Sequence, residues 1–95
     1  KIDEIAERVL TLEGTPLHSY SAYMKISEIK EVTGLSNGLE CVKQIMDSLV
    51  ILIRKEREIL ALAAEAGDDG TQDMLNPYIT AQEKTLWMLR AFLSE

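Results

Sequence analysis

The 95-residue chain is long enough for a single domain and carries a formal net charge of −6. A chain of this length buries only about 60–65% of its unfolded surface, so we expect its stability to depend on partners. Its hydrophobic content of 46% is too high for a disordered protein. The negative charge argues against nucleic acid as the default partner, because binding phosphates requires clustered Lys and Arg. It favours the attraction of cations.

Several features favour the cytoplasm. The longest run of large apolar residues, Leu49 to Ile53, is far shorter than the roughly 20 residues that cross a bilayer. The first residues form an amphipathic stretch rather than a signal peptide. Cys41 is the only cysteine, which excludes an intrachain disulfide and suits a reducing compartment. We therefore expect a cytoplasmic location and no membrane partner.

The first predicted element is a helix over residues 1–13. Its apolar residues recur close to the 3.6-residue helical period, at Ile2, Ile5, Ala6, Val9, Leu10 and Leu12. Gly14 is the expected residue just past the helix end, and Thr15-Pro16 prevents the helix from continuing. No residue caps the start of the pattern convincingly. We therefore expect the chain to begin inside a helix whose earlier residues lie outside this sequence.

A short helix is predicted within residues 18–29, followed by a loop over residues 31–38. Ser36 or Asn37 can cap the next helix, which should extend as far as the residue before Gly67. At about 1.5 Å per residue this helix is about 45 Å long, a length typical of long-helix bundles.

The centre of this long helix is apolar around most of its circumference, at residues 49–53. Such a segment should be buried on more than one side. On the helix surface, Arg54 and Glu58 are four residues apart and should form an ion pair.

A last helix is predicted after a turn at residues 68–71, and Pro77 allows two arrangements for it. Either Asn76 caps a new helix with Pro77 at its first position, or one helix is kinked there. One tryptophan and three methionines are most simply core residues, namely Trp87, Met46, Met74 and Met88. The sequence shows no strand-like alternation, so the predicted fold class is all-α.

The first helix carries two carboxylates on one face. Asp3 and Glu7 are four residues apart, a spacing at which like charges repel. Glu4 and Arg8 have the same spacing and opposite charges, so the neighbouring face is neutralised. A bound cation, such as iron with mixed oxygen and nitrogen ligands, would relieve the repulsion. On spacing alone, such a pair more often indicates a solvated acidic first turn, which the helix dipole favours.

Three further acids, Asp68, Asp69 and Asp73, cluster at the start of the last helix. Asp69 and Asp73 could line an acidic pore or a cation entry site, although capping and dipole complementarity explain the spacing better. His18 lies in a turn, where histidine is more often solvated or structural than a ligand. Because no predicted helix carries a histidine, a complete di-iron site within this chain is not expected. Cys41 is interpreted as a small core residue.

Three stretches resemble the Dps mini-ferritins, the DNA-binding proteins from starved cells. Residues 1–17 resemble the second-helix segment of that family. Residues 67–75, GDDGTQDML, resemble its turn between the third and fourth helices, and residues 82–89, QEKTLWML, resemble its fourth-helix signature around a tryptophan. The three stretches occur in the family's order, and the resemblance covers essentially all 95 residues.

The resemblance implies a ferritin-like four-helix bundle, represented here as one N-terminally truncated domain over residues 1–95. The chain would hold part of the second helix, a short connecting helix and the third and fourth helices. Members of the family form dodecameric shells, oxidise Fe(II), preferentially with hydrogen peroxide, and store the ferric mineral inside. The resemblance therefore implies iron as the bound metal, a homo-oligomer, and a cytoplasmic or nucleoid-associated location.

In this family the ferroxidase site lies between two subunits. One subunit supplies two histidines, and the other supplies an Asp and a Glu from an Asp-x-x-x-Glu-Arg motif. The resemblance makes Asp3 and Glu7 the iron ligands and catalytic residues of this chain, with Arg8 beside them and the histidine ligands outside these 95 residues. Trp87 matches a tryptophan that packs near that site.

The acidic turn also has a counterpart in the family. Asp69 and Asp73 match the lining of the iron-entry pores on the threefold axes, and residues 18–29 match a helix at the dimer twofold. Iron oxidation and storage is the first reading of the sequence. The alternative is a DNA-binding stress-protection protein that does not depend on iron, which the charge does not support. A third reading is a helical interaction module whose acids are only surface charge.

Overall fold

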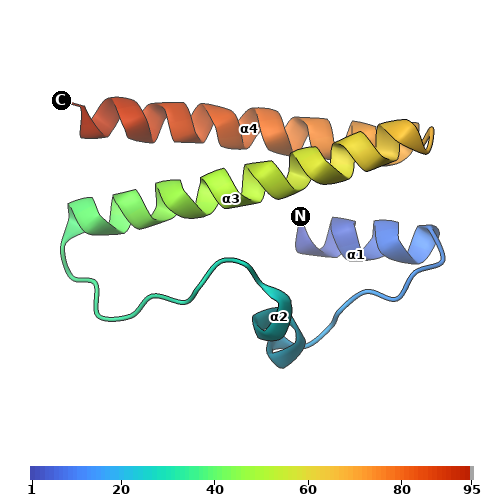
Figure 1. The fold of residues 1–95 in the computed structure, drawn as a ribbon, viewed down its shortest axis with the longest axis horizontal. Coiled ribbons are helices and arrows are strands. Elements are labelled where there is room, and N and C mark those ends of the chain that lie inside the picture. Colours follow the sequence, from blue (N-terminus) through green and yellow to red (C-terminus); the bar gives the residue numbers. More distant parts are fainter. Residues whose placement is uncertain (95) are drawn as a thin grey trace. The chain divides into compact units, whose positions relative to one another are not determined.

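The structure is a computed structural model that describes residues 1–94. It contains four helices, α1 (Ile2–Thr11), α2 (Tyr20–Ile26), α3 (Gly38–Glu65) and α4 (Asp69–Leu93), and the described residues form no strand (Figure 1). The all-α prediction is therefore confirmed. The chain divides into two compact units, unit 1 (Lys1–Lys30) with α1 and α2, and unit 2 (from Glu31 onward) with α3 and α4. None of the described helices combines the length and the apolar character that crossing a membrane requires.

Helix α1 is amphipathic, with its apolar side turned towards the rest of unit 1. Ile2, Ile5, Ala6 and Val9 line a cavity of about 290 Å³, together with Pro16, Leu17 and Tyr23. No residue of α1 is buried in the described chain. The apolar side of this helix is therefore only partly covered by the rest of unit 1.

The end of α1 differs from the prediction. The helix ends at Thr11, and the residue in the left-handed conformation is Glu13, with φ 67°, rather than Gly14. Gly14 has a different role, because its backbone N–H donates to the Val9 carbonyl at 2.9 Å and a Cβ atom there would lie 2.9 Å from Val9 Cγ1. The glycine is needed for this close approach.

Helix α2 begins and ends at local polar contacts. The Ser19 hydroxyl accepts from the Ala22 backbone N–H at 3.3 Å and so caps the start of the helix. The Tyr23 hydroxyl donates to the Leu17 carbonyl at 3.0 Å, and the rings of Tyr20 and Tyr23 meet edge to face with centroids 6.4 Å apart. The short helix predicted within residues 18–29 is confirmed.

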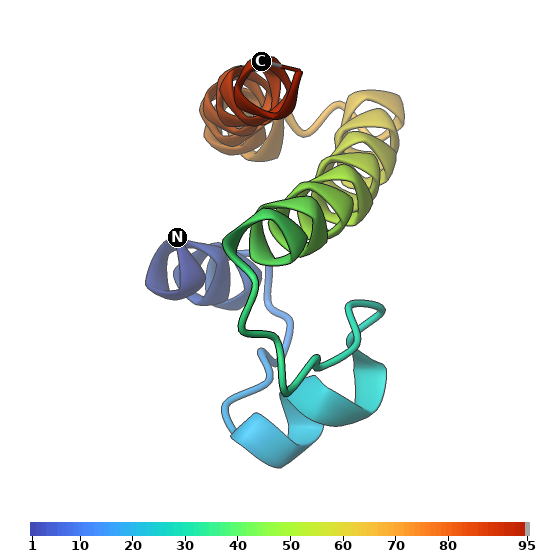
Figure 2. The same ribbon diagram turned by 90° about the vertical axis from the view of Figure 1, so that its left-hand side faces the viewer.

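In unit 2, α3 and α4 run side by side in opposite directions and are joined by a tight turn (Figure 1). Figure 2 looks roughly along the two helices and shows this turn. Asn37 caps α3, because its side-chain oxygen accepts from the backbone N–H groups of Leu39 at 2.9 Å and Glu40 at 3.3 Å. Gly67 adopts φ 71°, the left-handed conformation that glycine tolerates after a helix. Both ends of α3 thus agree with the sequence.

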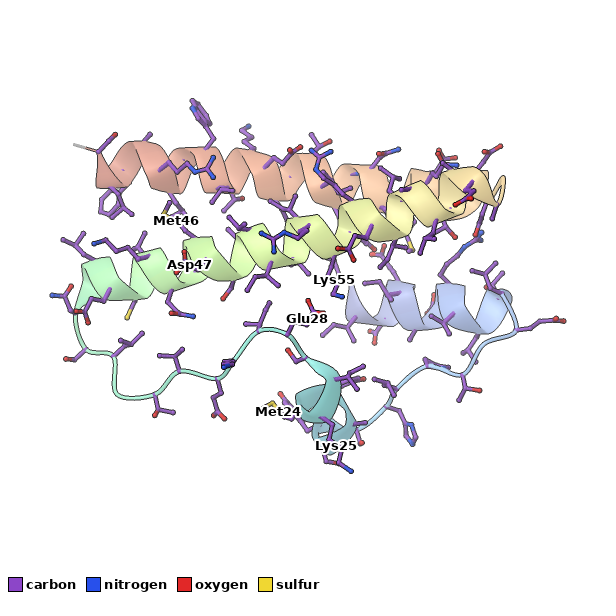
Figure 3. The ribbon with its side chains drawn as sticks, viewed as in Figure 1. Met24, Lys25, Glu28, Met46, Asp47 and Lys55 are labelled. Atoms are coloured by element: carbon purple, nitrogen blue, oxygen red, sulfur yellow. The ribbon has the colours of Figure 1, made fainter. Side chains whose placement is uncertain are left out.

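The core of unit 2 lies where the two helices face each other. Its buried apolar residues are Ile53, Ala63, Leu75, Tyr78, Ile79 and Leu86. In Figure 3 the half-buried Met46 projects from α3 towards α4, whereas Lys55 points away from α4. Of the apolar run at residues 49–53 only Ile53 is buried, and Leu52 is 38% exposed. The burial on several sides expected for this run is therefore not provided by unit 2 itself.

Of the two arrangements that the sequence leaves open at Pro77, the structure shows one helix that continues through the proline, so Asn76 does not cap a new helix. Two other predictions for unit 2 are wrong. Glu58 pairs with Lys55 at 3.9 Å rather than with Arg54. Trp87 and Met88 are 64% and 49% exposed instead of being core residues. Leu86, the neighbour of Trp87, faces α3, and the next residue of a helix is turned by about 100°.

Candidate functional site

The two acids that the sequence singles out in the first helix stand on the polar side of α1. Asp3 and Glu7 are both exposed, and neither lines the apolar cavity of unit 1. At a separation of four residues on a helix their Cβ atoms are about 5–6 Å apart. Asp3 also lies in the first turn, where the helix dipole favours a negative charge. The fold thus presents both carboxylates to the outside without using them for packing.

This arrangement supplies oxygen ligands but not a complete metal site. Among residues 1–94 no group of three or more His, Cys, Asp or Glu side chains converges in a way that could hold a metal ion. His18, the only histidine, is exposed in the segment between α1 and α2. Arg8 follows Glu7 and is half-buried in the last turn of α1. Asp3 and Glu7 could therefore serve a metal only together with ligands from elsewhere.

The acidic turn of unit 2 divides into one capping residue and two others. Asp68 caps α4, since its carboxylate accepts from the Thr71 backbone N–H at 3.1 Å and from the Thr71 hydroxyl. Asp69 and Asp73 are exposed and do not cap the helix, although the Gln72 amide lies 3.5 Å from Asp69 Oδ1. Capping therefore explains Asp68 but explains neither Asp69 nor Asp73.

Sequence reasoning missed a groove on unit 2. It has a volume of about 760 Å³ and an apolar floor that includes Val50, Ile53 and Leu86. Arginines border it, and Arg57 forms an ion pair with Glu83 across the two helices. A helical projection of both helices together would have been needed to find it, because its lining comes from residues far apart in the sequence.

A buried polar pair was missed as well. Glu56 and Gln82 are each 6% exposed, and Gln82 Nε2 lies 3.4 Å from Glu56 Oε2. A sequence signal for the pair exists, because Glu56 lies three residues after Ile53 and Gln82 lies three residues after Ile79, so both share the buried side of their helices. Cys41, interpreted as a core residue, is half-buried with a free thiol.

The chain is similar to known proteins along its whole length. A family model described as a ferritin-like domain matches residues 1–95. A protein of Porphyromonas gingivalis named DNA protection during starvation protein is 42% identical over 95 residues, which are 100% of this chain and 60% of that protein. A Brevibacillus brevis protein of the same name is 38% identical over 92 residues, 97% of this chain and 62% of that protein.

Solved structures agree with these matches. The crystal structure of the Dps protein of Vibrio cholerae, described as a member of a broad superfamily of ferritin-like diiron-carboxylate proteins, superposes with a TM-score of 0.92 at 46% identity. The match covers 96% of this chain and 57% of that chain. Dps from Thermosynechococcus elongatus gives a TM-score of 0.90 at 28% identity, covering 98% and 59%. The chain thus spans less than two thirds of the length of these relatives.

Proposed function

Because the chain belongs to the ferritin-like family and, within it, to the Dps proteins, we propose that the whole protein oxidises Fe(II) and stores the ferric product. Copies of the chain assemble into a hollow shell, which we expect to be dodecameric. The observation that carries the proposal is the pair Asp3 and Glu7, exposed on one side of α1 with no role in packing. The diiron-carboxylate description of the Vibrio cholerae relative supports it.

In this proposal Asp3 and Glu7 bind the iron substrate as oxygen ligands. Fe(II) accepts carboxylate oxygen together with imidazole nitrogen. The described residues contain no cluster that could complete such a site, so the nitrogen ligands come from outside these 95 residues, on a neighbouring subunit. Arg8 and Trp87 lie close to the ligands in the assembly and orient or enclose them. The site is complete only between two subunits.

The proposed oxidant is hydrogen peroxide. Two Fe(II) ions each give up one electron, and the two electrons break the O–O bond of the peroxide. Two protons from solvent are taken up, and two water molecules form. The carboxylates transfer no electrons, and their role is to hold two iron ions at the site and to offset the positive charge that increases when Fe(II) becomes Fe(III). The ferric product then leaves the site for the interior of the shell.

The proposal is tested by removing the charge of each ligand without changing its shape. In the intact protein, Asp3→Asn or Glu7→Gln should slow Fe(II) oxidation by peroxide by roughly 100-fold or more, since loss even of a residue that supports a ligand costs 10–100-fold. The rate is followed by the absorbance of ferric iron, and the assembly by sedimentation. Glu4→Gln is the matched control, because Glu4 shares the first turn of α1 but not the face of Asp3 and Glu7.

A site that is shared between subunits can also be tested by mixing two kinds of variant subunit. Co-assembly of Asp3→Asn subunits with subunits that lack the histidine ligands should restore part of the activity, because some sites then receive both intact halves. Oxidation by Asp3→Asn and Glu7→Gln at the parent rate would show that the two acids are only a solvated face, and the proposed function would be wrong.

We place Asp69 and Asp73 at a pore through which iron enters the shell. Around a threefold axis the two residues would present six carboxylates, whose combined negative potential raises the local Fe(II) concentration. Asp69→Asn with Asp73→Asn should slow iron uptake by several-fold at low ionic strength without changing the assembly. The difference should shrink as added salt screens the field. Unaltered uptake at low salt would contradict the pore.

The names of the relatives favour a second candidate function, the protection of DNA by direct binding. The net charge of −6 opposes it within these 95 residues, since affinity for DNA comes mainly from Lys and Arg at phosphates. A gel shift of the intact protein over a series of salt concentrations separates the two functions. Tight binding that weakens steeply with salt, in a protein that does not oxidise iron, would favour the second candidate.

A further inference from the structure

Two buried polar side chains of unit 2 have no part in the helix caps or in the proposed iron sites. Glu56 on α3 and Gln82 on α4 are each 94% buried, although Glu is almost never fully buried without a partner. Thr71, the third buried polar residue in the described part of the chain, is explained by its hydrogen bonds to Asp68. Glu56 and Gln82 meet each other across the helix interface, with 3.4 Å between Glu56 Oε2 and Gln82 Nε2.

The apolar residues of the interface do not define a single alignment of the two helices. Buried or half-buried apolar residues recur along both helices at intervals of four and seven. They are Leu49, Ile53 and Leu60 on α3, and Leu75, Ile79 and Leu86 on α4. If α4 moved by one turn, apolar residues would still face one another at most positions other than those of Glu56 and Gln82. The turn at Gly67 holds the helices together at one end, and the polar pair is roughly 20 Å away from it at about 1.5 Å per residue.

The polar pair, in contrast, tolerates only one alignment. After a shift of one turn, Gln82 would face an apolar residue of α3 and Glu56 would face an apolar residue of α4. Both groups would then stay buried without the contact that joins them, and losing a hydrogen-bonding contact in a buried place is costly. We propose that Glu56 and Gln82 act as an alignment lock, which fixes the rotation and register of α3 against α4.

A buried polar pair of this kind stabilises the protein less than an apolar pair would, but it favours one alignment of the two helices. Replacing a buried polar or ionic pair by apolar residues is often neutral or stabilising, whereas removing one partner is strongly destabilising. The lock matters for function because α4 carries Asp69 and Trp87 on its exposed sides. A rotation of α4 would displace both towards different neighbours. The inference does not depend on iron chemistry, and its test requires no iron.

The first measurement is thermal unfolding of the intact protein. Gln82→Leu leaves the Glu56 carboxylate buried without its amide partner and should lower the Tm by roughly 10 °C or more. The double variant Glu56→Leu/Gln82→Leu should unfold at or above the parent Tm. Glu56→Gln keeps a hydrogen-bonding group at both positions, so its Tm should lie between those of Gln82→Leu and the double variant. The non-additivity of the single and double variants identifies the pair as a unit.

The chain offers a matched control one position further along each helix. Arg57 and Glu83 join the same two helices by an ion pair, but both side chains are about half exposed, at 56% and 47%. Arg57→Ala/Glu83→Ala should shift the Tm by only a few degrees, because exposed ion pairs contribute little. A Gln82→Leu effect no larger than this control would overturn the lock.

The second measurement reports alignment rather than stability. Spin labels at two exposed positions, Asp47 on α3 and Ala91 on α4, give the distance between the helices after Cys41→Ser removes the native thiol. The parent and the Arg57→Ala/Glu83→Ala control should show one narrow distance distribution. The double Leu variant should show a broad or two-peaked distribution, although its stability is not reduced. A single narrow distribution in the double Leu variant would show that apolar packing alone aligns the helices, and the proposal would fail.

Discussion

Helix α1 and the pair α3–α4 use their side chains in opposite ways. No residue of α1 is buried, and its apolar residues border a shallow cavity while its acids face outward. In the pair α3–α4, the buried residues hold two long helices together, and even polar side chains are buried between them. The difference teaches that the proposed iron ligands belong to the part of the molecule whose own packing constrains them least. We therefore expect their geometry to be completed by assembly, whereas the arrangement of α3 and α4 is fixed by packing within the chain.

The largest expected effect is on the free energy of unfolding, and it tests the difference in packing between α1 and the pair α3–α4. Leu75 is 3% exposed, and Leu75→Ala should destabilise the protein by about 2–5 kcal/mol, since it removes buried methyl groups and leaves a cavity. The matched change in α1 is Ile2→Ala at a residue that is 73% exposed. It should cost less than about 0.5 kcal/mol, which is the usual range for surface changes. Both values come from urea unfolding followed by circular dichroism.

A large effect of Ile2→Ala would break the comparison. It would show that the exposed apolar residues of α1 are covered in the assembly, and that α1 contributes to stability through its partners. Repeating the measurement at two protein concentrations separates these cases, since stability that arises from assembly depends on concentration.

A smaller effect is expected at the acidic turn, where one carboxylate is structural. Asp68→Ala removes the cap of α4 and should cost about 0.5–2 kcal/mol. Asp69→Ala removes no cap. It removes a long contact with the Gln72 amide and the favourable interaction with the helix dipole, which contributes about 0.3–1 kcal/mol. The two variants are compared by thermal unfolding at low salt and again at high salt. Equal costs for both would mean that capping does not distinguish Asp68 from its neighbour.

The smallest expected effect concerns the proposed ligands. The double change Asp3→Asn/Glu7→Gln should alter the stability by about 0.5 kcal/mol or less, because relief of the repulsion between the acids offsets a weaker interaction with the helix dipole. Denaturant unfolding without iron measures this value. Stability that is unchanged while iron oxidation is lost would assign the acids to function alone. A cost of several kcal/mol would instead make them structural.

The parts of the fold that local chemistry decides were predictable from the sequence. Asn37 can cap a helix and Gly67 can adopt the left-handed conformation wherever they occur, so both ends of α3 followed from these residues. Pro77 was ambiguous because proline suits the first turn of a helix and is only disfavoured inside one. The packing of Leu75 and Tyr78 against α3 holds the helix continuous through it.

Features that depend on neighbours were not predictable in the same way. Arg54, Lys55 and Glu58 are close in sequence, and long flexible side chains choose partners by small energy differences. The exposure of Trp87 depends on which surface covers α4, and composition does not give this. For the candidate site, spacing could identify Asp3 and Glu7 as a pair on one face. Their role as ligands stays a prediction, because it requires groups outside these residues.

The position of Pro77 within α4 has a consequence for how this helix opens and closes in time. Proline has no backbone N–H, so the Asp73 carbonyl lacks the donor that would follow it by one turn. The ladder of backbone hydrogen bonds is therefore interrupted between the first turns of α4 and the longer part that follows. Amide protons on the two sides of the gap should exchange with solvent as separate groups, with those nearer the acidic turn exchanging sooner. The end of α4 that carries Asp69 and Asp73 can thus fluctuate while the rest of the helix stays closed.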